Sequence, residues 1–292
     1  DLPALGRPSR PTSAFAPSNR CSDSFSQQSW RAAASFRGEQ LQHELAYSYN
    51  KTERQYFTEG LPGFGTEGTL DRVSYLGSYA PADILQLVYG VDHEEQTLDD
   101  GTFDTERDQT GVYLEYQGRI GDKLYFTAGG RYDDNEDFGS HDSYRVSAAY
   151  LVPVGAGELK FKGAWSTGFR APSLYEIAYN NSFFAFPPAA GTKLQEERSE
   201  GLDLGVGWYG PTGLVLEAIL FEQTVEQEIY FDLVGYSGYL QGSGDSDSSG
   251  VELIAELPLP LQLSLQGNYT YNDTDTAAGG HRVYRPRHLA NV

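Results

Sequence analysis

The sequence contains no methionine and a single cysteine, Cys21, among its 292 residues. One cysteine cannot form an internal disulfide and is too little for a metal site built from cysteines. Without methionine there is no initiator residue, and the first residues, DLPALGRPSR, hold no apolar stretch of the signal-peptide kind. We therefore expect a mature form or an internal segment of a longer chain.

Positive charge is also scarce, and long apolar runs are missing. The chain has 21 Lys and Arg against 41 Asp and Glu, a formal net charge of −20. This balance argues against a nucleic-acid partner, because phosphate binding needs clustered Lys and Arg. No apolar run approaches the roughly 18–20 residues of a transmembrane helix, which excludes a helical membrane protein. A membrane β-barrel is not excluded, because its strands hide their apolar residues in alternation.

What the chain has instead is an alternation of apolar and polar residues with a period of two. In residues 261–272, LQLSLQGNYTYN, one side of an extended chain carries Leu261, Leu263, Leu265, Tyr269 and Tyr271. Successive side chains of a strand point to opposite faces, so such a segment has one apolar and one polar face. This alternation predicts about 13 strands, near 29–36, 41–50, 68–78, 84–91, 109–117, 123–133, 142–152, 158–170, 198–208, 214–224, 239–256, 261–272 and 284 onward.

The connections between these strands alternate between short turns and long polar segments. Short connections lie near 37–40, 79–83, 118–122, 153–157, 209–213 and 257–260. Long ones lie near 51–67, 92–108, 134–141, 171–197, 225–238 and 273–283. Short turns on one side and long loops on the other are typical of an outer-membrane barrel, with periplasmic turns and extracellular loops.

A soluble β-sandwich or β-propeller would also alternate, but its strands usually run about 5–6 residues. The strands expected here run about 10 residues, the length that a tilted strand needs to cross a bilayer. Tyrosines at the ends of the apolar faces also match an interfacial aromatic girdle. We therefore expect an all-β, antiparallel transmembrane β-barrel, with no helix of useful length.

Residues 165–176, WSTGFRAPSLYE, resemble the signature of TonB-dependent outer-membrane receptors, in which a strand ending in GFRAPS opens a long extracellular loop. Further segments resemble motifs of the same family in the same order: LYFTAGGRYDDNEDFGS (124–140), LQEERSEGLDLG (194–205), EQEIYF (226–231), SSGVEL (248–253) and YRPRHLAN (284–291). Gln195, Asp203 and Glu228 depart from the family pattern. The resemblance covers roughly 110–292 and is nearest to the cobalamin and ferric-siderophore receptors.

The resemblance implies a barrel of 22 strands around an N-terminal plug domain. We find neither a TonB box nor a plug-type glycine motif, so 1–292 is expected to be part of the barrel domain, without the plug and the terminal strands. Residues 1–28 are then expected to form an extracellular loop. The implied partners are outer-membrane lipid and lipopolysaccharide, the TonB complex through the plug, and a small-molecule or metal-chelate ligand.

The implied function is uptake of a scarce, large solute, such as siderophore-bound iron or cobalamin, through the bacterial outer membrane. A passive porin-like channel or a structural barrel is the alternative, and it would lack coupling to TonB. An enzyme is not expected, because the five histidines are scattered and neither H-E-x-x-H nor G-x-S-x-G in a strand-to-helix context is present. The family resemblance requires no resident cofactor.

The loop 171–197 is the expected ligand-binding segment. It carries Tyr175, Tyr179, Asn180, Phe183, Phe184 and Phe186. Exposed rings on a loop suggest a ligand surface, although packing against neighbouring loops or lipid headgroups would explain them too. Arg170 faces the lumen by parity, where it could contact ligand or plug, or pair with a barrel carboxylate.

Two polar connections are rich in carboxylates, at 92–108 and 133–142. Clustered carboxylates could hold Ca²⁺, which takes six to eight oxygen ligands. The candidates are Asp99, Asp100, Asp104 and Asp108. No EF-hand spacing is present, and a solvated acidic loop is the other interpretation.

Overall fold

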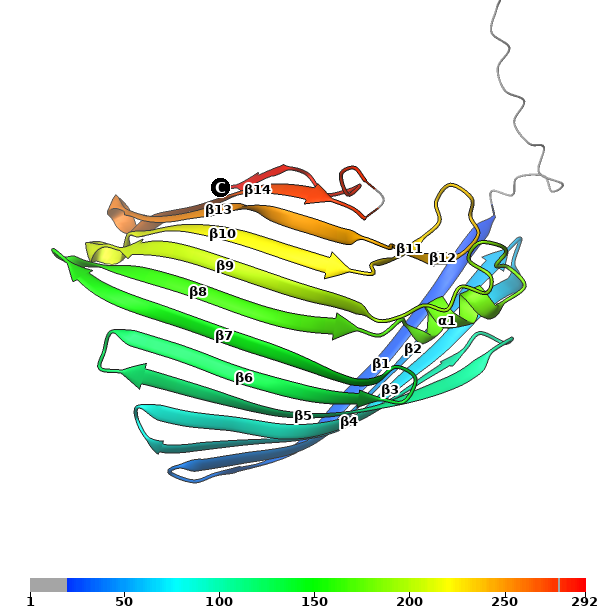
Figure 1. The fold of residues 1–292 in the computed structure, drawn as a ribbon, viewed down its shortest axis with the longest axis horizontal. Helices are drawn as coiled ribbons and strands as arrows, with labels where there is room; N and C mark the ends of the chain where they lie inside the picture. The colour runs from blue at the N-terminus through cyan, green and yellow to red at the C-terminus, as the bar shows by residue number, and fades with distance from the viewer. Residues whose placement is uncertain (1–19, 278) are drawn as a thin grey trace, which may run out of the picture.

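The computed structural model describes residues 20–277 and 279–292, and most of them form one antiparallel sheet of 13 strands. Neighbours in the sheet follow chain order, with β1 and β15 at its two edges, and the sheet curves into a trough (Figure 1). Its strands are β1 (Cys21–Arg37), β2 (Leu41–Thr58), β3 (Leu61–Ala82), β4 (Leu85–Asp99), β5 (Asp104–Ile120), β6 (Leu124–Asn135), β7 (Gly139–Val154), β8 (Gly157–Arg170), β9 (Glu197–Tyr209), β10 (Val215–Glu226), β13 (Asp245–Leu259), β14 (Leu263–Asp275) and β15 (His288–Asn291). The expected all-β antiparallel class is confirmed.

Five short elements complete the described fold. Helix α1 (Leu174–Asn181) lies between β8 and β9, and the short strands β11 (Ile229–Phe231) and β12 (Tyr239–Gln241) pair with each other between β10 and β13. The segments Pro211–Gly213 and Pro260–Gln262 form 3₁₀ turns. In the described part of the chain, no helix combines the length and apolarity needed to cross a bilayer.

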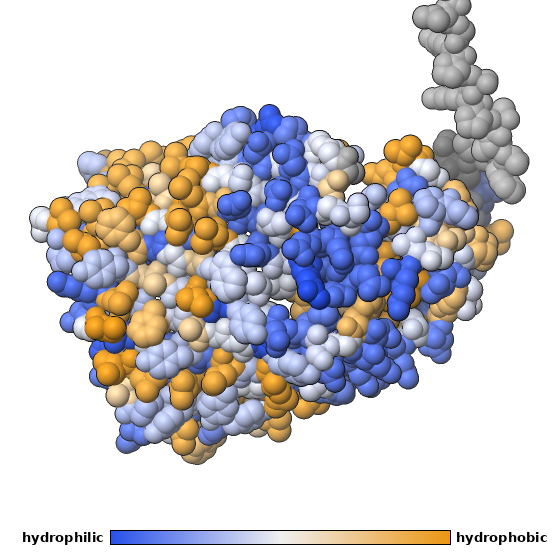
Figure 2. All heavy atoms as spheres, in the orientation of Figure 1, coloured by the Kyte–Doolittle hydropathy of each residue, from blue (hydrophilic) through white to orange (hydrophobic). Residues whose placement is uncertain are grey.

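The cross-strand register keeps apolar residues on one face of the sheet. Leu220 of β10 lies opposite both Leu204 and Val251, and Val251 lies opposite Tyr271. Such pairs form a continuous apolar surface because side chains directly opposite each other are in contact range. Figure 2 shows apolar side chains gathered on the half of the molecule near the short turns and hydrophilic ones toward α1.

The other face of the sheet is polar. Lys162 of β8 pairs with Glu217 of β10, across the intervening β9, at 2.7 Å. Thr127 and Ser147 form a hydrogen bond at 2.7 Å between β6 and β7. The alternation in the sequence therefore corresponds to two faces of opposite character.

Three of the expected long loops are wrong, because strands continue through them. Residues 59–60, 100–103 and 136–138 suffice to connect β2 to β3, β4 to β5 and β6 to β7. Above the apolar band both strand faces are polar, so the period-two signal vanishes while backbone pairing continues. The Thr69–Thr97 hydrogen bond at 2.7 Å is one polar cross-strand contact of this kind.

The structure also corrects three further local expectations from the sequence. Cys21–Gln28 belong to β1 and are not a loop, while 1–19 lie outside the described residues. An eight-residue helix, α1, is present where none was expected. Leu261 leaves the apolar face of β14, because it lies in the 3₁₀ turn with φ +64°.

Candidate functional site

Helix α1 opens the connection between β8 and β9, and its start is fixed by the local sequence. The Ser173 hydroxyl accepts a hydrogen bond from the Glu176 amide at 3.2 Å, and the Glu176 carboxylate accepts one from the Ser173 amide at 2.7 Å. This capping box satisfies two amides that have no intrahelical partner. The APSLYE part of the signature segment thus specifies a helix start.

The helix packs onto the ends of β4 and β5. Leu174 and Ala178 are buried against Leu98 of β4. Arg107 of β5 is buried, and it donates hydrogen bonds to the Pro172 carbonyl at 2.6 Å and to Gln96 Oε1 at 2.9 Å. The connection therefore lies against the long-loop end of the sheet, where Figure 1 shows α1.

Arg170 and Glu197 are the last residue of β8 and the first of β9, and they form a bidentate ion pair. Arg170 Nε donates to Glu197 Oε2 at 2.7 Å, and Nη2 donates to Oε1 at 2.8 Å. Arg170 also reaches Glu176 at 3.1 Å, while Glu197 accepts the Ile229 amide at 2.6 Å. Burial alone would raise the pKa of Glu197, but the hydrogen bonds from Arg170 and Ile229 hold it below its ordinary value.

Two separate connections join into one body, which we call the loop unit (residues 171–196 and 227–244). The Asn180 side chain donates to the Tyr239 carbonyl and accepts from the Tyr239 amide, both at 2.8 Å. Gln241 exchanges two further 2.8 Å hydrogen bonds with the backbone of Gln195. Asn180 is 4% exposed, so its amide is committed to bracing the unit.

The turn after β11 is organised by Asp232. Its carboxylate accepts the amides of Val234 at 3.1 Å and Gly235 at 2.8 Å, and the Ser237 hydroxyl at 2.7 Å. Bonds from the Gly235 amide and the Ser237 hydroxyl lower the pKa of Asp232. The turn thereby holds Val234, which is almost fully exposed, at the surface of the loop unit.

Replacing Asp232 by alanine is expected to loosen this turn and increase proteolytic cleavage within residues 232–237. Because the folded pKa is lowered, the carboxylate stabilises the turn above its ordinary pKa, and that stabilisation is lost as pH falls through the lowered value. Cleavage of the wild-type turn should therefore increase only below about pH 4. Limited proteolysis over a pH series measures this, with Asp122→Ala in a short turn as the control. Equal cleavage of Asp232→Ala and wild type at neutral pH would refute the role of this side chain.

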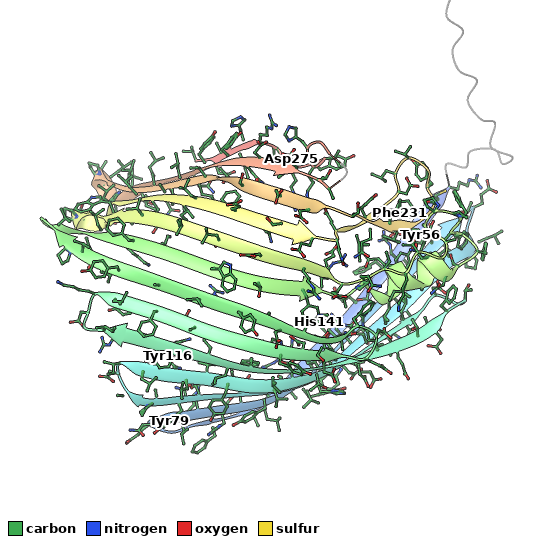
Figure 3. The ribbon with its side chains drawn as sticks, viewed as in Figure 1. Tyr56, Tyr79, Tyr116, His141, Phe231 and Asp275 are labelled. Atoms are coloured by element: carbon green, nitrogen blue, oxygen red, sulfur yellow. The ribbon has the colours of Figure 1, made fainter. Side chains whose placement is uncertain are left out.

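A cluster of rings fills the interior of the loop unit. Tyr239 lies 5.7 Å from Tyr179, 5.3 Å from Phe231 and 6.4 Å from Tyr175, between ring centroids, in edge-to-face arrangements. Phe64 of β3 contacts Tyr175 at 6.4 Å. Figure 3 places Phe231 and Tyr56 at this end of the molecule. The predicted ligand residues Tyr175 and Tyr179 are thus half-buried partners of other loops.

The three phenylalanines predicted to contact ligand lie on the surface. Phe183, Phe184 and Phe186 are 79%, 51% and 49% exposed. Phe183 and Phe184 pack against each other at 4.0 Å, and the Phe186 amide donates to the Ser237 carbonyl at 3.1 Å. They offer an accessible apolar surface that is tied to the second connection.

Sequence reasoning missed Phe231, Tyr236 and Tyr239 as companions of this surface. They lie about 35–40 residues beyond the expected loop, within or just after the EQEIYF motif. The EQEIYF motif drew attention to this segment of the sequence, but no local sequence pattern predicts that its rings contact Tyr179.

The four calcium candidates do not come together. Asp99 and Asp100 accept amides of their own turn, from Gly101 and from Phe103, at 2.7 and 2.8 Å. Among residues 20–277 and 279–292, no three His, Cys, Asp or Glu side chains form a group that could hold a metal ion. Calcium binding by Asp99, Asp100, Asp104 and Asp108 stays a prediction.

The polar wall below the loop unit carries a buried charge cluster that sequence reasoning did not assign. Arg131 of β6 contacts Asp92 at 2.8 Å and Asp133 at 2.7 Å. Arg72 of β3 reaches Asp92 at 3.3 Å. These contacts cross-link β3, β4 and β6 on the polar face of the sheet.

Comparison with known proteins identifies one matching family model and several solved structures with a similar fold. A family model described as TonB dependent receptor-like, beta-barrel matches residues 3–292. The siderophore receptor PirA from Pseudomonas aeruginosa has a TM-score of 0.72 at 18% identity, covering 87% of this chain and 51% of that chain. A mutant of the ferric enterobactin receptor PfeA from the same organism has a TM-score of 0.75 at 16% identity, covering 92% and 46%. The copper transporter OprC has a TM-score of 0.67 at 14% identity, covering 91% and 48%.

The chain thus spans about half the length of these solved structures. At identities of 14–18%, the likeness concerns the fold.

Proposed function

The chain belongs to the family of TonB-dependent receptor β-barrels, and from this premise we propose that it is part of a receptor that imports a scarce, large solute. The sheet is a segment of an outer-membrane barrel, so its apolar face meets lipid and its polar face lines the lumen. Siderophore-bound iron or cobalamin would suit such a receptor. In this proposal the TonB complex drives transport through the plug domain.

The observation that carries the proposal is the loop unit above the polar wall. Its two connections are braced by backbone hydrogen bonds and by the Arg170–Glu197 pair, so its exposed rings are held in place before a ligand arrives. Preorganised surfaces bind more tightly because less conformational entropy is lost on binding. A passive porin-like channel has no need of a braced ligand surface at its mouth.

Energy coupling distinguishes the two functions. Cells that express the whole receptor are given radiolabelled iron chelates and cobalamin, with and without a protonophore, and in a strain without TonB. We expect uptake of one cargo to be abolished by either treatment. Uptake that continues unchanged in both cases would favour the passive channel.

The exposed phenylalanines are expected to contribute to binding of that cargo. Truncating Phe183, Phe184 and Phe186 together to alanine should raise the dissociation constant at least fivefold, since a central interface ring contributes about 1 kcal/mol or more. Equilibrium binding to the purified receptor measures the effect. Phe36→Ala, an exposed ring near a short turn, is the control. Unchanged affinity in the triple variant, with increased protease sensitivity of the loop, would assign the rings to loop packing.

A further inference from the structure

Strands β7 and β8 separate at the end that lies nearest α1. Their backbone ladder stops at the pair Arg145–Ser166, although β7 begins at Gly139 and β8 continues to Arg170. The ladders on either side do not stop there, since β6 pairs with β7 as far as Gly139 and β9 pairs with β8 as far as Arg170. Figure 1 shows β7 and β8 diverging toward α1. The sheet therefore has a fork between these two strands.

The fork leaves backbone groups without a partner on the facing strand. The amide of Tyr144, the residue before Arg145, donates to the Thr167 hydroxyl at 3.0 Å and not to a backbone carbonyl of β8. Backbone groups along a strand point to alternate sides, so those of Asp142 also face the fork. Because unpaired backbone groups do not occur at a lipid-exposed position in hydrocarbon, the fork lies above the apolar core of the bilayer.

A groove of about 570 Å³ opens at this fork. We call it the fork groove, and it is lined by parts of residues 140–144, 167–169, 198–200 and 224–226 of the neighbouring strands β7 to β10. Thr167 and Phe169 follow Trp165 two and four residues further along β8, and so share its outward face. The groove is therefore on the outside of the sheet and not on its polar inner face.

Trp165 marks the upper border of the apolar face. It lies opposite Val146 and Leu202, and its Nε1 donates to Glu200 at 2.6 Å, an arrangement typical of an interfacial tryptophan. Phe169 lies roughly 13 Å further along the strand, which is about 9 Å in height at a tilt of about 45°. The headgroup layer on each side of a bilayer is about 5–8 Å thick. The fork groove thus spans the headgroup layer and the space just above it.

Several groups in the fork groove are free to accept hydrogen bonds. In the part of the chain that the structure describes, the carboxylates of Asp142 and Glu226 have neither an ion pair nor a hydrogen bond. His141 is only 9% exposed, and its Nε2 donates to the Phe138 carbonyl at 3.1 Å while its ring stacks on Phe169 (Figure 3). A neutral histidine has one donor and one acceptor nitrogen, so His141 Nδ1 remains an acceptor.

Hydrogen-bond donors line the same groove. Arg198 is exposed and donates to Glu196 at 2.9 Å, which leaves most of its five N–H groups available. The Ser140 hydroxyl and the backbone amide of Asp142 add two further donors. A matching ligand therefore both donates and accepts. Sugar hydroxyls do both, whereas an ammonium group only donates and a phosphate oxygen only accepts.

We propose that the fork groove binds the sugar headgroup of a glycolipid in the outer leaflet of the membrane. The occupant is a membrane lipid, because the groove lies on the outward face, directly above an apolar surface that contacts acyl chains. A large headgroup is favoured over a small one, since the groove extends above the headgroup layer. This inference concerns the outside of the barrel and does not depend on which cargo the loop unit binds.

The test titrates lipids onto the whole purified receptor in detergent and counts bound lipid by native mass spectrometry. The probes are a rough lipopolysaccharide with a short sugar headgroup, phosphatidylethanolamine and phosphatidylglycerol. We expect the lipopolysaccharide to bind at least tenfold more tightly than either phospholipid, also in the presence of a chelator. Equal binding of the three lipids would overturn the proposal. Loss of binding in the chelator would contradict it too, because a divalent cation would then replace direct hydrogen bonds.

The free core oligosaccharide of the same lipopolysaccharide tests the source of the sugar. It should displace the glycolipid only at a concentration at least tenfold higher than the intact glycolipid needs, because it lacks acyl chains. Displacement at equal concentration would show a site for soluble sugars and would refute the lipid assignment. No cargo is present in these measurements, so failure of the uptake proposal is recorded separately by the protonophore and TonB experiment.

Two double variants localise the site. Asp142→Ala with Glu226→Ala removes the free carboxylates of the groove, and Glu106→Ala with Asp108→Ala removes two carboxylates from the outward face of β5. Both changes remove two negative charges, so charge alone would strengthen binding of the anionic lipopolysaccharide in both. We expect the groove variant to bind at least threefold more weakly and the control not to weaken. Unchanged or stronger binding in the groove variant would refute the proposal.

Folding of each variant is checked first by the heat-dependent gel shift of a folded barrel. If the alanine variant of the groove does not fold, Asp142→Asn with Glu226→Gln takes its place, with Asp108→Asn and Glu106→Gln as the matched control. The same direction of change is expected, because an amide offers fewer acceptor sites than a carboxylate.

Discussion

Replacing Leu253 by arginine is expected to cost about 2–4 kcal/mol of barrel stability, because the new charge would face hydrocarbon near the middle of the bilayer. Leu253 lies on the apolar face of β13, opposite Ala218 and Tyr269. It is six residues from the short-turn end of its strand, about half of a membrane crossing. Leu263, by contrast, begins β14 beside the turn, where an arginine reaches the interface at little cost.

The matched control is Thr270→Arg. Thr270 lies opposite Glu252 on the polar face, at the same depth as Leu253 and Tyr269. An arginine there points into the wet lumen beside a carboxylate and should change stability by less than about 1 kcal/mol. Urea or guanidinium unfolding of the folded receptor in lipid vesicles measures both variants. Equal destabilisation would show that the two faces are assigned wrongly.

The second large effect is expected from Arg170→Ala. The change leaves the carboxylates of Glu197 and Glu176 without their shared cation, and the Glu197 and Glu176 side chains are only 12% and 13% exposed. Removing one partner of a buried pair costs about 3–5 kcal/mol, but the Arg170 side chain is 44% exposed, so we expect about 1–3 kcal/mol. The loss should be local to the loop unit, because Glu197 also holds the Ile229 amide.

Hydrogen exchange of the loop unit measures this loss, with cargo affinity as a second readout. Arg170→Lys should restore only part of the protection, since a lysine ammonium lacks the planar pair of donors that matches the two carboxylate oxygens of Glu197. Arg198→Ala is the control, because the Arg198 side chain is 64% exposed and its pair with Glu196 should contribute under about 1 kcal/mol. Protection equal to wild type in Arg170→Ala would show that the pair does not brace the loops.

Much of the fold could be predicted from alternation alone. Leu124, Phe126 and Ala128 fall on one face of β6, and Thr127 falls on the other, where it bonds Ser147. Alternation did not predict the ends of strands where both strand faces are polar, as in residues 92–108. The helix was missed although Ser173 and Glu176 have the spacing of a capping box, because one eight-residue helix gives little periodic signal.

The site could be predicted only in part. Phe183, Phe184 and Phe186 were named from the sequence, and the structure places them on the surface, whereas it commits Asn180 to the backbone of Tyr239. The sequence did not decide whether Arg170 contacts ligand, contacts the plug or pairs with a barrel carboxylate. The structure pairs it with Glu197. Both residues of that pair belong to segments that resemble motifs of the family, but their spacing in the sequence does not predict that they are in contact.

The sequence by itself determined the class of fold, the two faces of each strand and the family. These depend on local physics, since side chains alternate along any extended chain and a bilayer needs one apolar face. Only the tertiary structure decided how the loops join. Asn180 meets Tyr239 across 59 positions, and Arg107 meets Pro172 across 65. Such contacts arise because the sheet curves and brings distant strand ends to one rim, and no local pattern encodes that proximity.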